Sequence, residues 1–307
     1  MKHPQTSPCV LMIAPTRFSF NEEAFETNKF QKRPGDSEDI RAQVMDEFYA
    51  FVEDLRELNI EVIAHEHSIE LDLPDAVFPN NWISTHRSGE LLLYPMAVPN
   101  RRAERSMEVI QSLMERNNYR VKDLSNYEQM ELFLEGTGSI IFDHENKIAY
   151  VAESPRSNRK VLDQVCQELG YKAVSFTSYG GAGELIYHTN VMMCVGRDYV
   201  IIGADTIAEE DRDRVLQHTQ NSGKQLILLT NDQVYNSFAG NMLQIENVYG
   251  ESVLVMSRSA HNSLRDDQLM KLNSLNDHVL AADIPTIERI GGGSARCMLA
   301  EVFPVSN

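Results

Sequence analysis

The chain has 307 residues, of which 42% are hydrophobic and 24% are charged, a composition typical of a globular protein with a large core. Its formal net charge of −17 would repel phosphate backbones and anionic lipid, so neither nucleic acid nor a membrane is expected as a partner. The apolar run at residues 10–14 is too short for a signal sequence or a membrane span, and the four cysteines show no CxxC spacing. We therefore expect a reducing compartment, by default the cytoplasm, and no metal or cofactor.

The chain begins with a predicted strand, helix and strand, and then repeats one pattern. The opening strand lies at residues 8–16, the helix at 40–58 and the second strand at 60–64. From residue 75 onward, each copy contains a strand, a turn, a second strand, a helix and an outer strand. The helices of the four complete copies are predicted at residues 102–116, 157–169, 209–220 and 263–275. A fifth copy begins at Gly293 and ends after its first strand, and residues 9–64 supply the pieces that it lacks.

The copies have a nearly constant period. Equivalent positions, each at the start of a first strand, are separated by 54, 53, 53 and 56 residues and are occupied by Asn81, Glu135, His188, Asn241 and Cys297. A fixed period of more than about 50 residues, with a hairpin and a helix in each copy, indicates radial repetition around an axis. We predict an α/β fold, a five-bladed β/α propeller with pseudo-fivefold symmetry, formed by residues 1–307 as a single domain. Its ring would be closed by N- and C-terminal pieces that share one blade.

This arrangement would gather a thiol, an imidazole and a carboxylate around one central cavity. Cys297 follows the glycine run at residues 291–293, where a loop is expected to lead into a strand. A lone cysteine is more often a small buried hydrophobic residue, and a lone histidine is more often structural. The shared register of Cys297, His188 and Glu135 favours a nucleophile with an acid/base partner and a carboxylate.

Amide side chains complete the predicted site. Asn80, Asn81, Asn190 and Asn241 can each donate and accept hydrogen bonds, although turn formation is the alternative role for each of them. On chemistry alone, peptidases, amidases, transglutaminase-like enzymes and guanidine-modifying enzymes remain open. The chain contains no G-x-S-x-G elbow, P-loop or G-x-G-x-x-G fingerprint in a suitable context, so nucleotide binding is not expected.

Three motifs resemble the Glu, His and Cys motifs of the arginine deiminase and amidinotransferase superfamily: Leu134-Glu135-Gly136-Thr137-Gly138, Tyr187-His188-Thr189-Asn190 and Gly291-Gly292-Gly293-Ser294-Ala295-Arg296-Cys297-Met298. The resemblance covers nearly the whole chain, and that superfamily has a five-bladed β/α propeller. The resemblance implies that Cys297 is the nucleophile, that His188 is the general acid/base and that Glu135 binds substrate N–H groups. The stretch Phe78-Pro79-Asn80-Asn81-Trp82 most resembles the branch of citrulline hydrolases.

The chain departs from the arginine deiminases at its amides. Those enzymes carry an aspartate where this chain has Asn190, and their relatives use aspartate where Asn80 and Asn81 stand. An amide suits the neutral ureido group of citrulline, whose C=O needs a donor, better than it suits a guanidinium cation. The predicted reaction is conversion of citrulline to ornithine, ammonia and CO₂ through a covalent intermediate on Cys297.

Two alternatives are kept. One is an arginine or methylarginine deiminase or an amidinotransferase, and the other is a non-catalytic propeller that binds an amino acid. Arg17, Arg156 and Arg159 are the candidates for the substrate carboxylate; Arg17 and Arg156 are expected to be solvated, which leaves Arg159. The predicted partner is a small amino-acid substrate, and an oligomer is compatible with the sequence.

Overall fold

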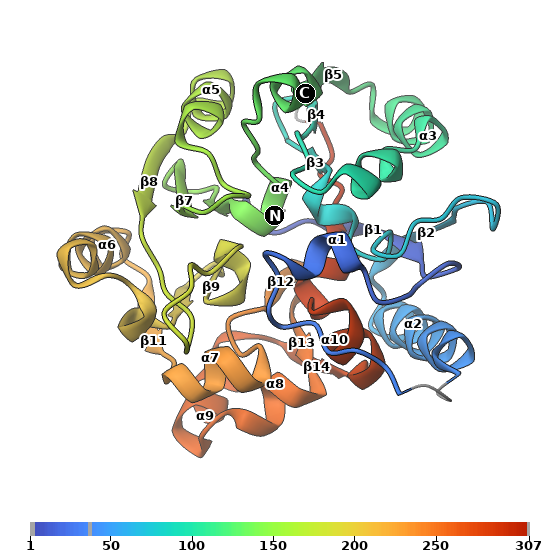
Figure 1. Cartoon of the computed structure of the whole chain (residues 1–307). Coiled ribbons are helices and arrows are strands. Elements are labelled where there is room, and N and C mark those ends of the chain that lie inside the picture. The colour runs from blue at the N-terminus through green and yellow to red at the C-terminus, as the bar shows by residue number, and fades with distance from the viewer. Residues whose placement is uncertain (1–3, 36–38, 306–307) are drawn as a thin grey trace.

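The computed structural model describes residues 4–35 and 39–305, which form five three-stranded sheets placed around a common centre (Figure 1). Each sheet has an antiparallel pair followed by a parallel pair. The first three sheets along the chain contain β1 (Cys9–Ala14), β2 (Glu61–Glu66) and β15 (Ala300–Glu301); β3 (Ile83–Thr85), β4 (Glu90–Leu93) and β5 (Arg120–Asp123); and β6 (Ile141–Asp143), β7 (Ile148–Ala152) and β8 (Lys172–Phe176). The other two contain β9 (Met193–Val195), β10 (Tyr199–Ile202) and β11 (Gln225–Leu228); and β12 (Leu243–Glu246), β13 (Ser252–Ser257) and β14 (His278–Ala282).

The two ends of the described chain share one sheet, as the split repeat predicts. β15 pairs antiparallel with β1, with Val10 opposite Glu301 and Leu11 opposite Ala300. β1 also pairs in parallel with β2 along all six of its residues. The predicted five sheets and the shared sheet are therefore confirmed, whereas the closed ring, its pseudo-fivefold symmetry and the single-domain assignment stay predictions.

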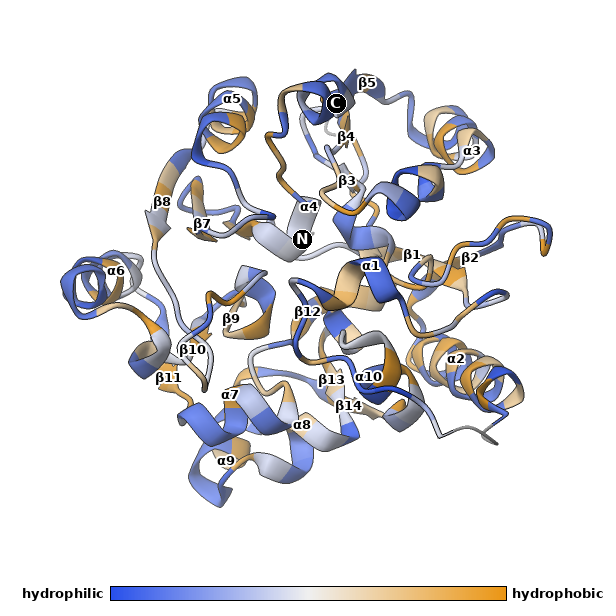
Figure 2. Ribbon diagram, in the orientation of Figure 1, coloured by the Kyte–Doolittle hydropathy of each residue, from blue (hydrophilic) through white to orange (hydrophobic). Residues whose placement is uncertain are grey.

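Helices connect the second and third strands of the sheets and lie on the outside of the molecule (Figure 1). They are α2 (Ile40–Glu57), α3 (Met107–Asn117), α5 (Arg159–Leu169), α6 (Glu209–Asn221), and the pair α8 (Arg258–Ser263) and α9 (Asp266–Leu275). The predicted apolar stripe of α2 is buried, with Val44, Phe48, Phe51, Val52 and Leu55 at most 1% exposed. Figure 2 shows the hydrophilic residues of the outer helices on their solvent side. No helix within the described ranges combines the length and apolarity needed to cross a bilayer.

Several element boundaries differ from the predictions. The helix expected at 263–275 is α9, which begins three residues later than predicted. A separate helix, α8, precedes it, and the Ser257 side chain caps α8 by accepting from Ala260 N at 3.1 Å. Three further helices were not predicted: α1 (Glu22–Phe25), α7 (Asn231–Ser237) and α10 (Pro285–Gly291). α10 begins with proline at its first position and ends before Gly292, which has φ of 62°.

The first strands are shorter than expected, and helical turns precede four of them. These turns are Pro79–Asn81, α4 (Gly136–Ser139), Thr189–Val191 and Ala295–Met298. Cys297 therefore lies within a 3₁₀ turn and not at the start of a strand. Toward the centre these segments have no neighbouring strand, so a local turn satisfies their backbone groups instead. The turns place the predicted site residues at the middle of the molecule.

Candidate active site

The helical turns at the centre bring side chains from four sheets together. Glu135 precedes α4, His188 precedes the turn Thr189–Val191, Asn241 precedes β12, and Cys297 lies in the turn before β15. All four residues are at most 3% exposed. Adjacent copies of the repeat are linked by side-chain hydrogen bonds, such as that from Thr189 Oγ1 to Ser139 O at 2.6 Å. The inference that equivalent positions of the repeat meet at the centre holds for these residues.

Two glycines after Glu135 make this approach feasible. Gly136 has φ of 47°, and a Cβ at this position would lie 2.2 Å from the backbone oxygen of Asn80. A Cβ on Gly138 would lie 2.4 Å from Asn81 Nδ2 and 2.8 Å from His188 Nδ1. Any larger residue at either position would push the neighbouring unit away. The Gly-Thr-Gly sequence thus lets three copies of the repeat, those that carry Asn81, Glu135 and His188, come into van der Waals contact.

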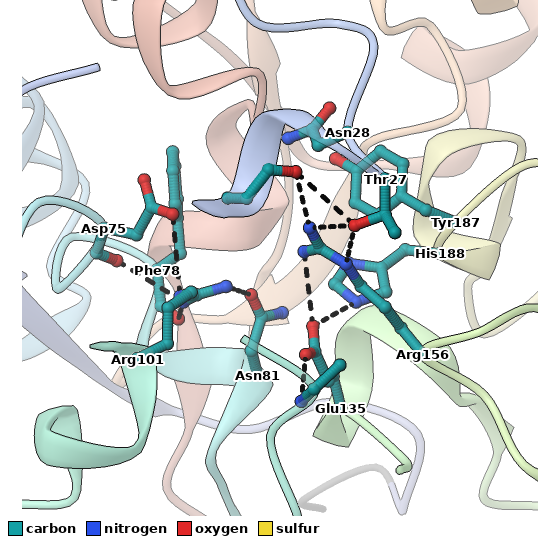
Figure 3. A network of polar contacts seen from close by, with 12 residues as sticks. Thr27, Asn28, Asp75, Phe78, Asn81, Arg101, Glu135, Arg156, Tyr187 and His188 are labelled. Carbon is teal, nitrogen blue, oxygen red and sulfur yellow. Dashed lines mark hydrogen bonds and ion pairs between the residues drawn. The ribbon is translucent and has the colours of Figure 1, made fainter. Parts of the chain in front are cut away.

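Glu135 and His188 form a buried pair (Figure 3). Glu135 Oε2 lies 2.8 Å from His188 Nε2, and Glu135 Oε1 accepts from Ala97 N at 3.0 Å. Burial by itself would raise the pKa of Glu135, but Arg156 and His188 lower it to about 2. Burial lowers the pKa of His188 to about 4, although Glu135 opposes this shift. At neutral pH the carboxylate is ionised and can only accept, so the neutral imidazole carries its proton on Nε2 and has a lone pair on Nδ1.

Cys297 is surrounded by amides. Asn190 Nδ2 and Asn241 Nδ2 each lie 3.3 Å from its sulfur. Asn241 is oriented by the backbone, because its Oδ1 accepts from Arg296 N at 3.0 Å and its Nδ2 also donates to Asn190 O at 3.0 Å. Both amides were predicted to bind substrate, and the structure places both against the sulfur of Cys297.

A charged network adjoins the Glu135–His188 pair (Figure 3). Arg101 forms a two-pronged ion pair with Glu104 at 2.8 and 2.9 Å and donates to Asn81 Oδ1 at 2.7 Å. Its Nε lies 3.7 Å from Asp75. Burial raises the pKa of Asp75, and it raises that of Glu104 to about 7 despite Arg101.

Arg156 links this network to the segment that covers it. Its Nη1 lies 3.5 Å from Glu135 Oε2, while its Nη2 donates to Ala24 O at 3.0 Å and to Thr27 Oγ1 at 2.6 Å. Asn28 Nδ2, on the same covering segment, donates to Gly292 O at 3.0 Å. Arg156 therefore holds residues 24–28 over the Glu135–His188 pair.

A cavity of about 10 Å³, room for about one water molecule, remains under this cover. Its lining contains the sulfur-bearing Cys297 together with His188, so the predicted nucleophile and acid/base residue face the same space. The remaining lining residues are Asn28, Asp75, Phe78, Asn81, Arg101, Arg156, Tyr187, Gly291, Gly292 and Gly293.

Residues 14–304, almost the whole chain, match the family described as N,N dimethylarginine dimethylhydrolase, eukaryotic. The chain belongs to this family. As a dimethylarginine dimethylhydrolase family member it is a hydrolase that acts on carbon–nitrogen bonds, as in the amidinotransferase superfamily that its motifs resemble. This assignment argues against the alternative of a non-catalytic propeller that binds an amino acid. None of the curated protein sequences compared with the chain matches it.

Solved structures share the fold at low sequence identity. The N-terminal domain of ArgZ, an arginine dihydrolase from the ornithine-ammonia cycle in cyanobacteria, was solved as a mutant bound to substrate; it has 18% identity and a TM-score of 0.74, covering 96% of this chain and 98% of that one. Unliganded AgrE has 18% identity and a TM-score of 0.75, covering 97% of this chain and 40% of its own. A dimethylarginine dimethylaminohydrolase variant, an adduct with S-methyl-L-thiocitrulline, has 14% identity and a TM-score of 0.65, covering 96% and 99%.

The structure brings most, but not all, of the predicted site residues together. Arg159 lies apart: its side chain is half exposed and pairs with Asp163 at 2.8 Å on α5. The arginine that lines the cavity is Arg156, which was expected to be solvated. Arg17 is part-exposed and lies 3.9 Å from Asp72.

Sequence reasoning missed the charged residues around Asn81. Asp75, Arg101 and Glu104 are buried and are not among the predicted site residues. An acid inside the apolar stretch Leu73–Phe78 was the available signal for Asp75, because a buried carboxylate needs a partner. Within the described part of the chain, no group of three His, Cys, Asp or Glu side chains is placed to hold a metal ion.

Proposed function

We propose that this family member hydrolyses citrulline to ornithine, ammonia and CO₂ through a covalent intermediate on Cys297. The observation that carries the proposal is the orientation of two adjacent amides. Arg101 always donates, so Asn81 must direct its Oδ1 toward that guanidinium. Asn81 Nδ2 then donates to Asn80 Oδ1 at 2.9 Å, which leaves the buried Nδ2 of Asn80 as a donor with no partner.

A donor fixed in this way distinguishes a ureido group from a guanidinium. The ureido group of citrulline has a carbonyl oxygen that accepts hydrogen bonds, whereas a guanidinium has only donors. A guanidinium facing Asn80 and Asn81 would leave the buried donor unpaired, which disfavours that ligand. The N–H groups of a ureido substrate would find acceptors in the Glu135 carboxylate and in Asn190 Oδ1, which also has no partner.

The residues around the cavity can divide the chemistry between them. Cys297 attacks the ureido carbon as its proton passes to the lone pair on His188 Nδ1. His188 returns that proton to the departing amine of ornithine, and a carbamoyl group remains on the sulfur. His188 then takes a proton from water, whose hydroxide displaces the thiolate. The released carbamate yields ammonia and CO₂, and Glu135 stabilises the imidazolium in both steps.

Incubation with citrulline, arginine and methylated arginines in separate reactions tests the proposal. Ornithine and ammonia should form from citrulline, and the C297S variant should form neither. Formation of citrulline from arginine or a methylarginine, with no ornithine from citrulline, would contradict the proposal.

Hydrolysis of arginine or methylarginine is the second candidate. It is favoured by Asp75, a buried carboxylate that lines the cavity and whose Oδ1 has no hydrogen-bond partner. A carboxylate at this position could accept from a guanidinium. The same set of reactions separates the two candidates.

A further inference from the structure

We infer that Asn190 and Asn241 act directly in catalysis by stabilising the thiolate that Cys297 forms when it gives up its proton. Both amides belong to different sheets from the cysteine and are fully buried. Each places its Nδ2 at 3.3 Å from the sulfur. Two amide donors therefore converge on the one atom that must carry negative charge.

The Asn241 amide is held by the backbone in the orientation that presents a donor. Its Oδ1 is occupied by Arg296 N at 3.0 Å, so the NH₂ group faces both Asn190 O and the sulfur. Rotation of this amide would oppose its NH₂ to the Arg296 N–H and lose two bonds. Donor presentation at Cys297 is thus a property of the folded backbone, independent of any ligand.

All polar contacts that the described residues make to the sulfur come from neutral groups: the two Nδ2 atoms at 3.3 Å and, farther away at 3.7 Å, Asn241 Oδ1. A hydrogen bond to the charged form of a group favours that form, so two N–H donors favour the thiolate. The guanidinium side chain of Arg296 points elsewhere, to Leu299 O at 2.8 Å and to Glu301. The amides stabilise the thiolate without placing a positive charge in the cavity.

The charge of the substrate determines whether such donors are needed. A guanidinium brings its own positive charge to the thiolate, whereas a ureido group brings none. This link rests on the proposed citrulline activity. The stabilisation of the thiolate does not, because it can be measured in the absence of any substrate.

The test is a pH titration of thiolate ultraviolet absorbance, taken as wild type minus C297S. The other cysteines do not interfere near neutral pH, because burial raises the pKa of Cys9 and of Cys194 to about 12 and that of Cys166 to about 11. The N190D variant keeps the shape of the side chain but replaces the donor with a carboxylate. Its thiolate midpoint should lie at least about 1 pH unit above that of the wild type.

Two further variants keep the result decisive. N158D makes the same substitution at the N-cap of α5, where aspartate caps equally well, and it should leave the midpoint unchanged. N190A removes the donor without adding charge, and it should raise the midpoint by a smaller amount. It replaces N190D if circular dichroism shows that N190D does not fold.

An unchanged midpoint in a folded N190D or N190A protein would overturn the inference. A raised midpoint in a protein that does not hydrolyse citrulline would support the inference and contradict only the proposed substrate. The pH profile of turnover gives a second readout, because its acidic limb should move with the thiolate midpoint in N190D and stay in place in N158D.

Discussion

The two sides of the central cavity are built from different chemistry. Around Cys297 the polar partners are neutral, with amides from Asn190 and Asn241 on the sulfur. Around Glu135 they are charged, with Arg156 at 3.5 Å and the Arg101–Glu104 pair beyond it. Both sides are buried, so burial alone does not explain the difference.

The contrast shows how each side controls a protonation state. On the charged side, Arg156 and His188 overcome the cost of burial and keep Glu135 ionised. That ionised carboxylate in turn fixes which nitrogen of His188 carries the proton. On the sulfur side, charge must appear and disappear during turnover, and neutral donors favour the thiolate without locking it in a permanent ion pair.

The largest expected effect comes from removing the charge on the Glu135 side. Every partner of this carboxylate is a donor: Ala97 N on one oxygen, and His188 and Arg156 on the other. Glutamine would place an NH₂ group against one of these donors. E135Q should lower kcat about 10²- to 10³-fold and cost about 3 kcal/mol of stability, measured by steady-state turnover and urea unfolding.

Glu128 provides the matched control for that substitution. It accepts from Met96 N at 2.8 Å and pairs with Arg105 at 2.6 Å, but it does not line the cavity. E128Q should lower stability while kcat changes less than about threefold. Equal losses of kcat in the two variants would show that the effect of E135Q is structural only.

A smaller effect should follow from changing how Arg101 holds Asn81. Lysine keeps the charge but cannot contact Glu104 through two nitrogens and Asn81 through a third. R101K should lower kcat/KM for citrulline about tenfold relative to that for arginine, because Asn81 would no longer be held in the orientation that leaves Asn80 Nδ2 as a free donor. R105K, which alters the Glu128 pair, should leave this ratio unchanged. An unchanged ratio in R101K would show that Asn81 does not determine the preference between citrulline and arginine.

The smallest effect concerns the pH dependence of stability. The pKa of His188 is about 4 in the folded protein, against 6.5 for an ordinary histidine. Between these values the unfolded chain binds the extra proton, so stability falls as the pH decreases from about 6.5 to 4. H188N should reduce this slope by up to about 1.4 kcal/mol per pH unit, measured by urea unfolding at several pH values. A slope identical to that of the wild type would contradict the assigned protonation state.

The sequence predicted which residues meet at the centre better than it predicted which side chains contact one another. A period of 53 to 56 residues placed Glu135, His188, Asn241 and Cys297 in equivalent positions, and the family match and the five sheets agree with that interpretation. Side-chain direction was not available from a period. Arg156 and Arg159 lie three residues apart, yet the first faces Glu135, whereas the second begins α5 and reaches Asp163 one turn later.

The irregular segments were hardest to predict. Short turns such as Pro79–Asn81 and Ala295–Met298 contain too few residues for any hydrophobic period to appear. The Arg101–Glu104 pair lies in a similar 3₁₀ segment, Pro99–Glu104, and its role depends on Asn81, 20 residues earlier. Such contacts are set by packing between units and leave no local signal in the sequence.

The pairing of β15 with β1 has a consequence for the timing of activity. Cys297 is the last of the site residues in chain order, and the strand that follows it docks on a strand from the opposite end of the sequence. Glu135, His188, Asn190 and Asn241 all precede Cys297 in the chain. Cys297 is therefore the last of these residues to be synthesised, and the site is complete only once β15 has been made and has paired with β1.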